Sequence, residues 1–504
     1  MESVRPEMRP WPQPNFGAAA VTPYLQRWEG PRRLALHTLL VAVCLVLYVL
    51  GSPSGTLIAS GLVVAGVFFW FVWLEAKSTV LKITPVSVYF LWQGFALGVA
   101  AVYMGLEIYD GSSIYLGKHN ISPEYIAKGY IIGLIGTLPL HAGLQWLRPK
   151  VDSRRELTPV LVKRLLPQLI FFWVLGIVVL ALNRQLVFAG TLVTVFQFAA
   201  HGALAVFILI PPEKLRMPES VRFGILVTGT FVLLLAATRS SSKLYLMQAL
   251  VGLFFYVLQR KHLHRHIPVA AVFLIFIYLT VVAPTVNEAR SIEFHDRVSH
   301  TQAQIEAFKK NSPLYTGKVE LEFYQHQIER LLGRQFEASS IGLIVGEVET
   351  KGYAYWESFE FLKYYFIPRL IWPDKPYMVR GAWFTHYLGL SAREADSTVA
   401  IGMEAAGELY WSFGVIGVLV GMFILGMLFA GVWRLAGADP GTDPIRMALY
   451  MLNALTMMNI PEAASRIASC LTLLLIFGVL FAVLRPHRES TKMVFRRPQF
   501  LGST

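Results

Sequence analysis

The chain has 504 residues, of which 55% are hydrophobic and only 15% are charged. Because a soluble domain carries about a quarter charged residues, this composition excludes an ordinary soluble protein. The net charge is +13, but most of the surplus Lys and Arg flank apolar runs, so we interpret it as a topology signal and not as nucleic-acid binding. Cys44 and Cys470 both fall inside apolar runs, which excludes a disulfide framework and a Cys-rich zinc site.

Twelve apolar runs follow one another along the chain, and most are long enough to cross a hydrocarbon core of about 30 Å. They occupy residues 34–50, 57–74, 85–105, 126–144, 165–182, 189–210, 222–238, 244–259, 267–283, 403–433, 446–460 and 463–484. The run 403–433 is long enough to include an interfacial lead-in, and 446–460 is short. The sequence therefore predicts an all-α, polytopic membrane protein with about 12 transmembrane helices.

The distribution of basic residues predicts the orientation of these helices. If the N-terminus is cytoplasmic, 26 Lys and Arg fall in cytoplasmic segments and five in the short outside loops. Cytoplasmic loops are normally the ones enriched in Lys and Arg, so we predict that both termini are cytoplasmic. The chain then divides into an N-terminal tail (1–33), helices one to nine (34–283), a large extracytoplasmic loop (284–402), helices ten to twelve (403–484) and a C-terminal tail (485–504).

The loop 284–402 is nearly neutral, with 13 Lys and Arg against 15 Asp and Glu. It is long enough to form a small cap over the membrane face. Its residues 298–335 show the pattern of one or two amphipathic helices. The apolar run in 336–350 is too short to span a membrane, so this stretch is predicted to be an interfacial helix or a re-entrant segment.

Thirteen aromatic residues crowd the second half of the loop, between positions 353 and 387. One interpretation is an aromatic belt at the level of the lipid headgroups. The other is a sugar-binding surface, because an aromatic ring offers an apolar face and Tyr and Trp add a polar handle. The prolines of YYFIPRLIWPDKP would hold the charged side chains there in fixed directions. The binding candidates in this segment are Arg369, Trp372, Lys375, Tyr377 and Trp383.

Two carboxylates stand at the start of the tenth apolar run. Glu404 and Glu408 are four residues apart, so a helix would place them on one face. They are either interfacial carboxylates exposed to water or cavity-facing groups that handle a proton, because a carboxylate is costly inside a membrane. His386, in WFTHYLG of the same loop, is a further candidate for a catalytic base.

Arginines, carboxylates and aromatic residues on one outer face suit a phosphorylated, amphipathic substrate. A guanidinium group binds phosphate oxygens in pairs and stays charged, and a departing diphosphate needs such charge. The sequence shows no Walker motif, no Gly-rich dinucleotide loop and no HExxH-like metal spacing. We therefore expect a reaction that uses no metal, nucleotide or other cofactor.

The strings TRSSSK, NEARS, PRLIWPDKP and GMEAAGELYWSFGVIGVLVGMFILG resemble those of the O-antigen and exopolysaccharide repeat-unit polymerases, the Wzy-like family. The resemblance covers roughly residues 235–435. It implies a GT-C-like glycosyltransferase of the bacterial inner membrane, which polymerises undecaprenyl-diphosphate-linked oligosaccharide repeat units on the periplasmic face. It also implies the lipid bilayer and a chain-length regulator as partners, and no nucleic acid.

The same analogy suggests roles for individual residues. Arg239, Arg290 and Arg369 match the outside arginines of the family, and with Lys243 they would hold the diphosphate or sugar. Glu408 matches the family's glutamate before the aromatic-Phe-Gly turn. Which of Glu404, Glu408 and His386 acts as the base stays open.

Other classes of function remain as alternatives. An O-antigen ligase would share this architecture but transfer the glycan to a lipid A core. A polysaccharide flippase or other transporter should show paired half-repeats and interrupted helices at the midplane. The polar residues here crowd at one face instead, although Gln93, Gln197 and His201 lie unexplained inside apolar runs. A sensor or scaffold that merely binds glycan is the last alternative.

Overall fold

The computed structural model describes residues 23–78, 83–111, 121–149, 159–182, 190–210, 212–215, 217–238, 300–317, 321–365, 380–390, 401–438 and 443–483, with isolated residues between them. Every regular element in these residues is a helix, and no strand occurs among them. The N-terminal half contains α1 (Pro23–Leu50), α2 (Pro53–Ser78), α3 (Pro85–Gln93), the π-helical turn η1 (Gly94–Val99), α4 (Ala100–Tyr109), α6 (Pro123–Trp146), α7 (Pro159–Ala181), α8 (Gly190–Leu209), α9 (Pro212–Leu215) and α10 (Glu219–Thr238).

The C-terminal half begins with short helices and ends with long ones. The short ones are the π-helical turn η4 (Tyr278–Val282), α15 (His300–Asn311), α16 (Pro313–Thr316), α17 (Leu321–Gln335), α18 (Ala338–Lys351), the 3₁₀ turn η5 (Glu357–Phe359), α19 (Leu362–Tyr365) and α20 (Arg380–Tyr387). The long ones are α21 (Ala405–Ala436), α22 (Pro444–Met458) and α23 (Ala463–Val483).

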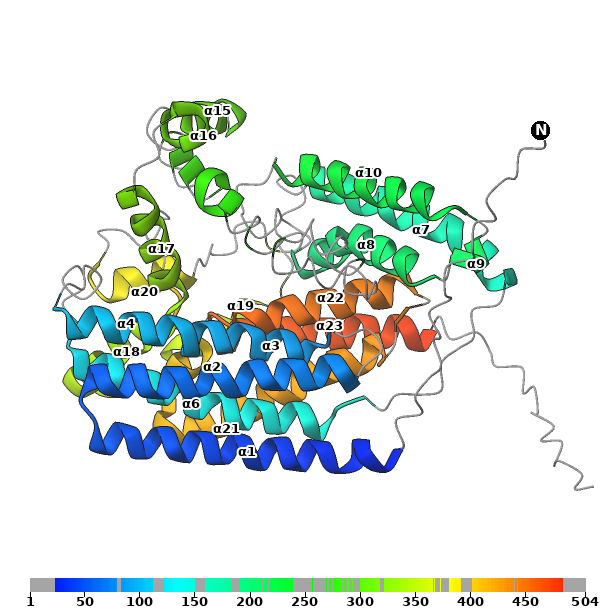
Figure 1. Ribbon diagram of the computed structural model, residues 1–504. Helices are drawn as coiled ribbons and strands as arrows, with labels where there is room; N and C mark the ends of the chain where they lie inside the picture. The colour runs from blue at the N-terminus through cyan, green and yellow to red at the C-terminus, as the bar shows by residue number, and fades with distance from the viewer. Residues whose placement is uncertain are drawn as a thin grey trace, which may run out of the picture.

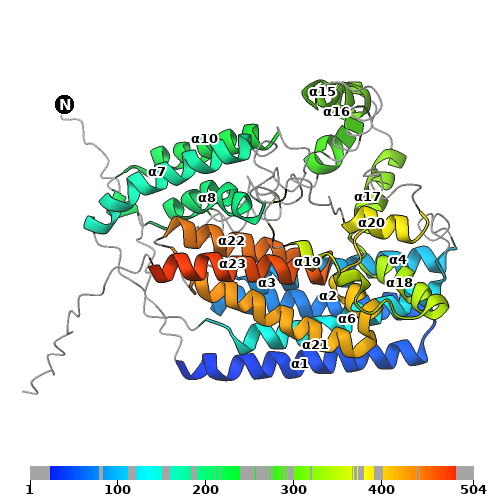
Figure 2. The same cartoon turned by 180° about the vertical axis from the view of Figure 1, so that it is seen from behind.

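The long helices run roughly parallel as one bundle (Figure 1). It contains α1, α2, α3–η1–α4, α6, α21, α22 and α23, while α7, α8 and α10 lie along one side of it, next to α22. The view from behind shows the same arrangement (Figure 2). At one end, which we call the loop end, α17, α18 and α20 pack on the bundle, and α15 and α16 project to the side on which α7, α8 and α10 lie. The first residues of α1 and the last of α23 lie at the opposite end.

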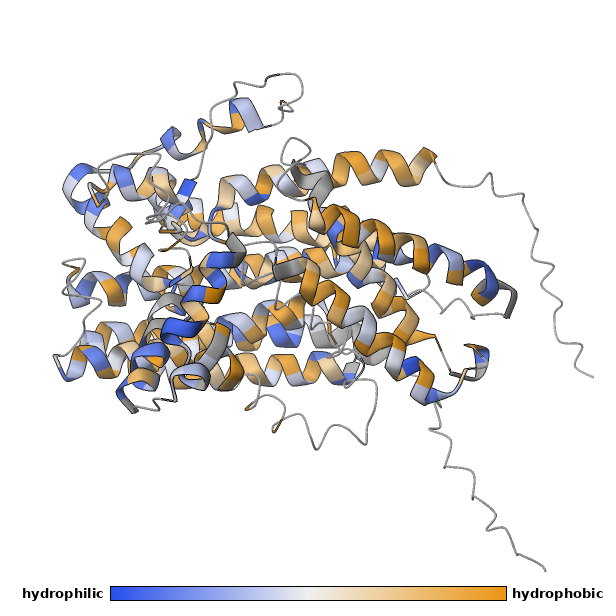
Figure 3. Cartoon of the chain, turned by 90° about the horizontal axis from the view of Figure 1, so that it is seen from above, coloured by the Kyte–Doolittle hydropathy of each residue, from blue (hydrophilic) through white to orange (hydrophobic). Residues whose placement is uncertain are grey.

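Seven described helical stretches are long and apolar enough to cross a membrane. They are Gly30–Leu50, Pro53–Lys77, Pro85–Tyr109, Val162–Ala181, Glu219–Ala236, Ala405–Ala436 and Ala463–Val483. Apolar residues dominate the middle of the helices and hydrophilic ones gather at their ends (Figure 3). The prediction of a helical, multi-pass membrane protein is therefore confirmed in its coarse form, while the count of twelve spans and the GT-C-like arrangement stay predictions.

Three further predicted runs correspond to α6, α8 and α22, and the runs 244–259 and 267–283 lie mostly outside the described residues. The helix α6 is enclosed by α1, α2, α18 and α21. Because protein surrounds it, α6 can carry buried polar residues such as Thr137 and His141, which lower its hydropathy.

Glycines allow α6 to approach its neighbours closely. A Cβ atom on Gly143 would lie 2.3 Å from the Phe423 carbonyl oxygen of α21, and one on Gly129 would lie 2.6 Å from the Gly342 nitrogen of α18. Small residues at such crossings are typical of membrane helices, which associate mainly through close packing and hydrogen bonds. The predicted interfacial or re-entrant segment 336–350 contains α18, and these contacts fix it against α6.

Helix α21 is broken near its start. Phe413 and Gly414 leave helical geometry, and Gly414 has φ 65° and ψ −157°, a combination that is essentially restricted to glycine. The turn folds residues 405–412 back on the following turns, because a Cβ on Gly417 would lie 2.5 Å from the Leu409 carbonyl oxygen. The lead-in suggested by the length of the run 403–433 is thus a separate short helix.

Candidate functional site

A buried ion pair fastens the aromatic-rich part of the loop to α21; we call its described residues, 353–365 and 380–387, the aromatic segment. Arg380 is the first residue of α20, and its Nη2 donates to Oε1 of Glu408 over 3.0 Å. The side chains are 5% and 0% exposed. The other carboxylate oxygen accepts from the Ala464 backbone N–H at the start of α23, also over 3.0 Å, and Arg380 donates to the Ser358 carbonyl oxygen as well. Both ions thus have additional hydrogen bonds, which a buried pair requires, although the Nε–H of Arg380 has no hydrogen-bond partner among the described residues.

Aromatic rings enclose the guanidinium group of Arg380. It lies 4.6 Å from the ring centre of Phe361 and 4.5 Å from that of Trp383, within the range of a cation–π interaction. The buried Trp411 of α21 contacts Trp383 and, at 4.8 Å between ring centres, Tyr387. Two hydrogen bonds add to this attachment, from Ala354 N–H to the Trp411 carbonyl oxygen and between the hydroxyls of Ser358 and Ser412.

Three half-buried carboxylates, Glu337, Glu404 and Glu462, lie at the same end and stand just before α18, α21 and α23 respectively. We call them the carboxylate group. Glu404 has a positive φ of 56°, and the next residue, Ala405, donates its N–H to the Ile460 carbonyl oxygen. This bond ties the start of α21 to the connection between α22 and α23.

The surroundings of the carboxylate group favour proton binding. Burial raises the pKa of Glu337 to about 7, although hydrogen bonds from Trp92 and Gln93 oppose the rise. Burial, and then the charges of Glu337 and Glu462, raise the pKa of Glu404 well above its ordinary value, against the charge of Arg466. Burial also raises the pKa of Glu462. Neighbouring carboxyls with raised pKa values can hold protons at a pH where an ordinary carboxyl is ionised.

Some of the predicted site residues make contacts in the structure, one is exposed, and others lie outside the described residues. Both carboxylate oxygens of Glu408 are engaged, whereas Glu404 is half-buried and belongs to the carboxylate group. His386 is exposed on α20. Trp383 packs on Arg380, and the ring of Trp372 lies 5.7 Å from that of Tyr364. The remaining candidates lie outside the described residues: Arg239, Lys243, Arg290, Arg369, Lys375 and Tyr377.

Three residues of this site were not predicted from the sequence, namely Arg380, Glu337 and Glu462. Glu462 lies in the turn NIPEAAS before an apolar run, and Glu337 directly precedes the apolar run of α18. An acidic residue at the edge of an apolar run is therefore the signal that could have found them. Nothing near Arg380 in the sequence indicates that it pairs with Glu408.

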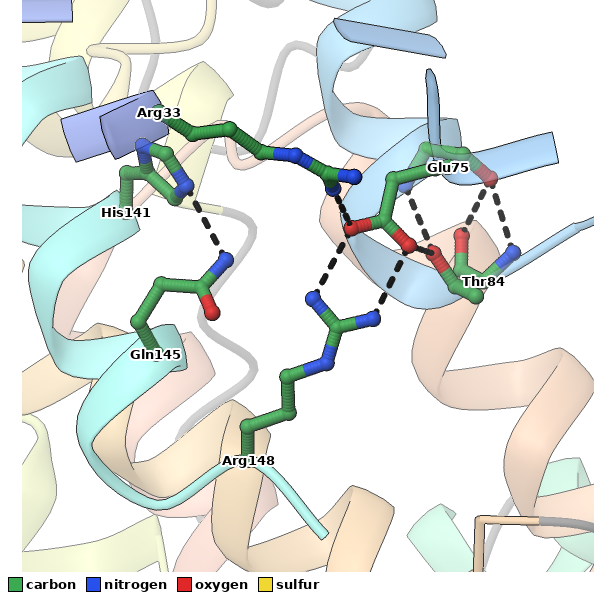
Figure 4. Close-up of polar contacts among 7 residues, drawn as sticks. Arg33, Glu75, Thr84, His141, Gln145 and Arg148 are labelled. Atoms are coloured by element: carbon green, nitrogen blue, oxygen red, sulfur yellow. Dashed lines mark hydrogen bonds and ion pairs between the residues drawn. The ribbon is translucent and has the colours of Figure 1, made fainter. Parts of the chain in front are cut away.

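A second buried network lies at the end opposite the loop end (Figure 4). Arg148, which follows α6, donates Nη1 and Nη2 to the two oxygens of Glu75 on α2, over 2.8 and 3.0 Å. Arg33 of α1 pairs with the same carboxylate, and Thr84 donates to it over 3.3 Å. The network thus joins α1, α2, α3 and α6 at that end of the bundle.

These features define a class: a multi-pass helical membrane protein in which an aromatic segment is held against a broken helix beside a group of carboxylates. Among the described residues, no three His, Cys, Asp or Glu side chains are grouped as metal ligands would be. No family model, curated protein or solved structure matches the chain.

Proposed function

We propose that the protein is a membrane glycosyltransferase that polymerises undecaprenyl-diphosphate-linked oligosaccharide repeat units on the periplasmic face of the bacterial inner membrane. In this proposal the loop end is periplasmic and the enzyme is GT-C-like, with neither metal nor nucleotide. The observation that supports it most is the buried Arg380–Glu408 pair. This pair holds the aromatic segment against α21, so that aromatic rings and carboxylates with raised pKa values share one end of the bundle.

The proposed reaction joins two lipid-linked glycans. A hydroxyl oxygen of the acceptor repeat unit attacks the anomeric carbon of the donor glycan, and the bond from that carbon to the diphosphate oxygen breaks. Undecaprenyl diphosphate leaves with the bonding electron pair, and a base removes the hydroxyl proton. Glu404 suits this role better than Glu408, because both oxygens of Glu408 already accept hydrogen bonds.

The departing diphosphate requires positive charge. The sequence-based candidates for this task are Arg239, Lys243, Arg290, Arg369 and Lys375, and they remain part of the proposal. Trp372, Tyr377 and Trp383 are the proposed sugar contacts, although Trp383 also packs on Arg380. In this scheme Arg380 and Glu408 act indirectly, because they position the segment that carries those residues.

The test is polymerisation by the purified protein in nanodiscs with a lipid-linked repeat unit. Wild-type protein should produce a ladder of glycans, and Glu404→Gln should slow it about 10²- to 10⁴-fold, as is typical for loss of a general base. Glu360→Gln is the matched control, because Glu360 is 62% exposed and pairs only with Lys363 three residues away among the described residues. A normal ladder from Glu404→Gln would exclude Glu404 as the base.

A ladder-free reaction that adds one glycan to a lipid A core would instead indicate a ligase. One observation favours a transporter: α21 is interrupted at Phe413–Gly414 next to half-buried carboxylates, as in the discontinuous helices of secondary transporters. Movement of lipid-linked glycan across sealed vesicles without any polymer would support that alternative.

A further inference from the structure

Four polar side chains form a chain between α1 and α6, next to the network around Glu75. His37 lies on α1, and Thr137, His141 and Gln145 lie one turn apart on α6. The Nδ1 atoms of the two histidines are 3.1 Å apart. His37 Nε2 lies 2.9 Å from Thr137 Oγ1, and His141 Nε2 lies 3.1 Å from Gln145 Nε2. Both histidines are 0% exposed.

The geometry determines which atom donates at each contact. The Thr137 hydroxyl donates to the Leu134 carbonyl oxygen over 2.7 Å, so it accepts from His37 and the proton of His37 is on Nε2. A neutral imidazole carries one N–H, so His37 Nδ1 accepts and His141 Nδ1 must donate to it. His141 Nε2 then accepts, and the amide nitrogen of Gln145 is the atom that faces it. The hydrogen bonds at Thr137 and at Gln145 therefore require the same donor and acceptor at every contact between them.

The groups around the two histidines disfavour a protonated ring. The rings of Phe68, Phe71 and Phe90 lie within 6.1 Å of the His37 ring, centre to centre, and enclose the pair in apolar groups. The charged groups on the packed elements are Arg33 of α1, Glu75 of α2 and Arg148 after α6 (Figure 4). Two guanidinium groups thus accompany one carboxylate, which makes an added positive charge unfavourable there.

We propose that this chain is an acid-sensitive latch, which joins α1 to α6 while both histidines are neutral and opens when one takes up a proton. On His37 the proton could only bind Nδ1, which would then face the N–H of His141. On His141 it would bind Nε2 and face the Gln145 amide N–H, which would have to rotate. The histidines of an opened chain gain protons below about pH 6.5, whereas the closed arrangement has no favourable place for them. The closed state therefore keeps its full stability above that pH and loses stability as the pH falls below it.

The direct test is ¹⁵N NMR of the full-length, histidine-labelled protein in nanodiscs at pH 8. We expect His37 to carry its proton on Nε2 and His141 to carry it on Nδ1, which is the rarer tautomer of free histidine. His37→Asn and His141→Asn assign the two signals. The reverse pair of tautomers, or Nε2–H on both rings, would overturn the proposal.

A second measurement tests the acid response. The Tm of the wild-type protein should fall between pH 8 and pH 5.5. His141→Asn keeps an amide donor near the position of Nδ1 and cannot titrate, so it should flatten this pH dependence. His326→Asn, at the exposed His326 of α17, is the matched control and should leave it unchanged. An equal pH dependence in all three proteins would refute the latch. If His141→Asn fails to fold, the NMR measurement of the wild-type tautomers decides whether the latch exists.

Discussion

At the loop end of the bundle one guanidinium meets one carboxylate, in the pair Arg380–Glu408, and further carboxylates with raised pKa values lie nearby. At the opposite end two guanidinium groups, from Arg33 and Arg148, share the single carboxylate of Glu75. Among these described residues, the loop end has surplus carboxylates and the opposite end has surplus positive charge. Which of the two ends faces the cytoplasm stays a prediction from the distribution of basic residues. The difference in charge suggests different tasks, because surplus carboxylates can accept protons whereas a shared carboxylate mainly holds helices together.

The largest effect is expected at the end opposite the loop end. Glu75→Ala should leave the buried guanidinium group of Arg33 and the half-buried one of Arg148 without their common carboxylate. We expect it to cost about 3–5 kcal/mol in the free energy of unfolding, the range for a broken buried ion pair. Unfolding of the purified protein in mixed detergent micelles would measure it. Glu408→Ala is the matched variant and should cost somewhat less, because it leaves only one guanidinium group. A smaller loss from Glu75→Ala than from Glu408→Ala would reverse the comparison.

The next prediction concerns the geometry of the loop-end pair. Arg380→Lys keeps the charge but loses the planar group that packs between Phe361 and Trp383. We expect a loss of about 1–2 kcal/mol, in the range of a desolvated cation–π contact, compared with about 3–5 kcal/mol for Arg380→Ala. The same unfolding measurement applies. Equal losses in the two variants would mean that the planar guanidinium group of Arg380 matters and that its charge alone contributes nothing.

The sequence predicted the helices of this fold better than the site. Apolar runs such as 57–74 and 463–484 identify α2 and α23, because a membrane requires continuous apolar length. The enclosed helix α6 was also found, although burial against protein relaxes that requirement. The break in α21 was not predicted, since Gly414 looks like any glycine of a membrane helix. The pairing of Arg380 with Glu408 depends on tertiary contact across 28 residues, which no local pattern encodes.

The third prediction concerns the pH dependence of stability that Glu337 causes at the loop end. The pKa of Glu337, about 7, lies above its ordinary value, so the folded protein binds this proton more tightly than the unfolded chain. Its contribution to stability is therefore complete at pH 4 and is lost as the pH rises towards 7. Glu337→Gln cannot ionise and should raise the Tm at pH 8 by a few degrees, at roughly 2–4 °C per kcal/mol, with no gain at pH 4. A similar change in Tm at both pH values would show that Glu337 does not titrate between them.

The smallest effect is expected from an exposed pair at the loop end. Lys128 of α6 pairs with Glu349 of α18, and their side chains are 36% and 40% exposed. Water screens such a pair, so a double-mutant cycle with Lys128→Ala and Glu349→Ala should give a coupling of about 0–1 kcal/mol. High salt should remove even this, because the screening length at 1 M is about 3 Å. The same cycle at Arg380 and Glu408 should give a larger coupling that salt leaves unchanged, since neither side chain is more than 5% exposed. If both cycles respond equally to salt, burial does not distinguish the two pairs, and Arg380–Glu408 is too accessible to hold the aromatic segment in place.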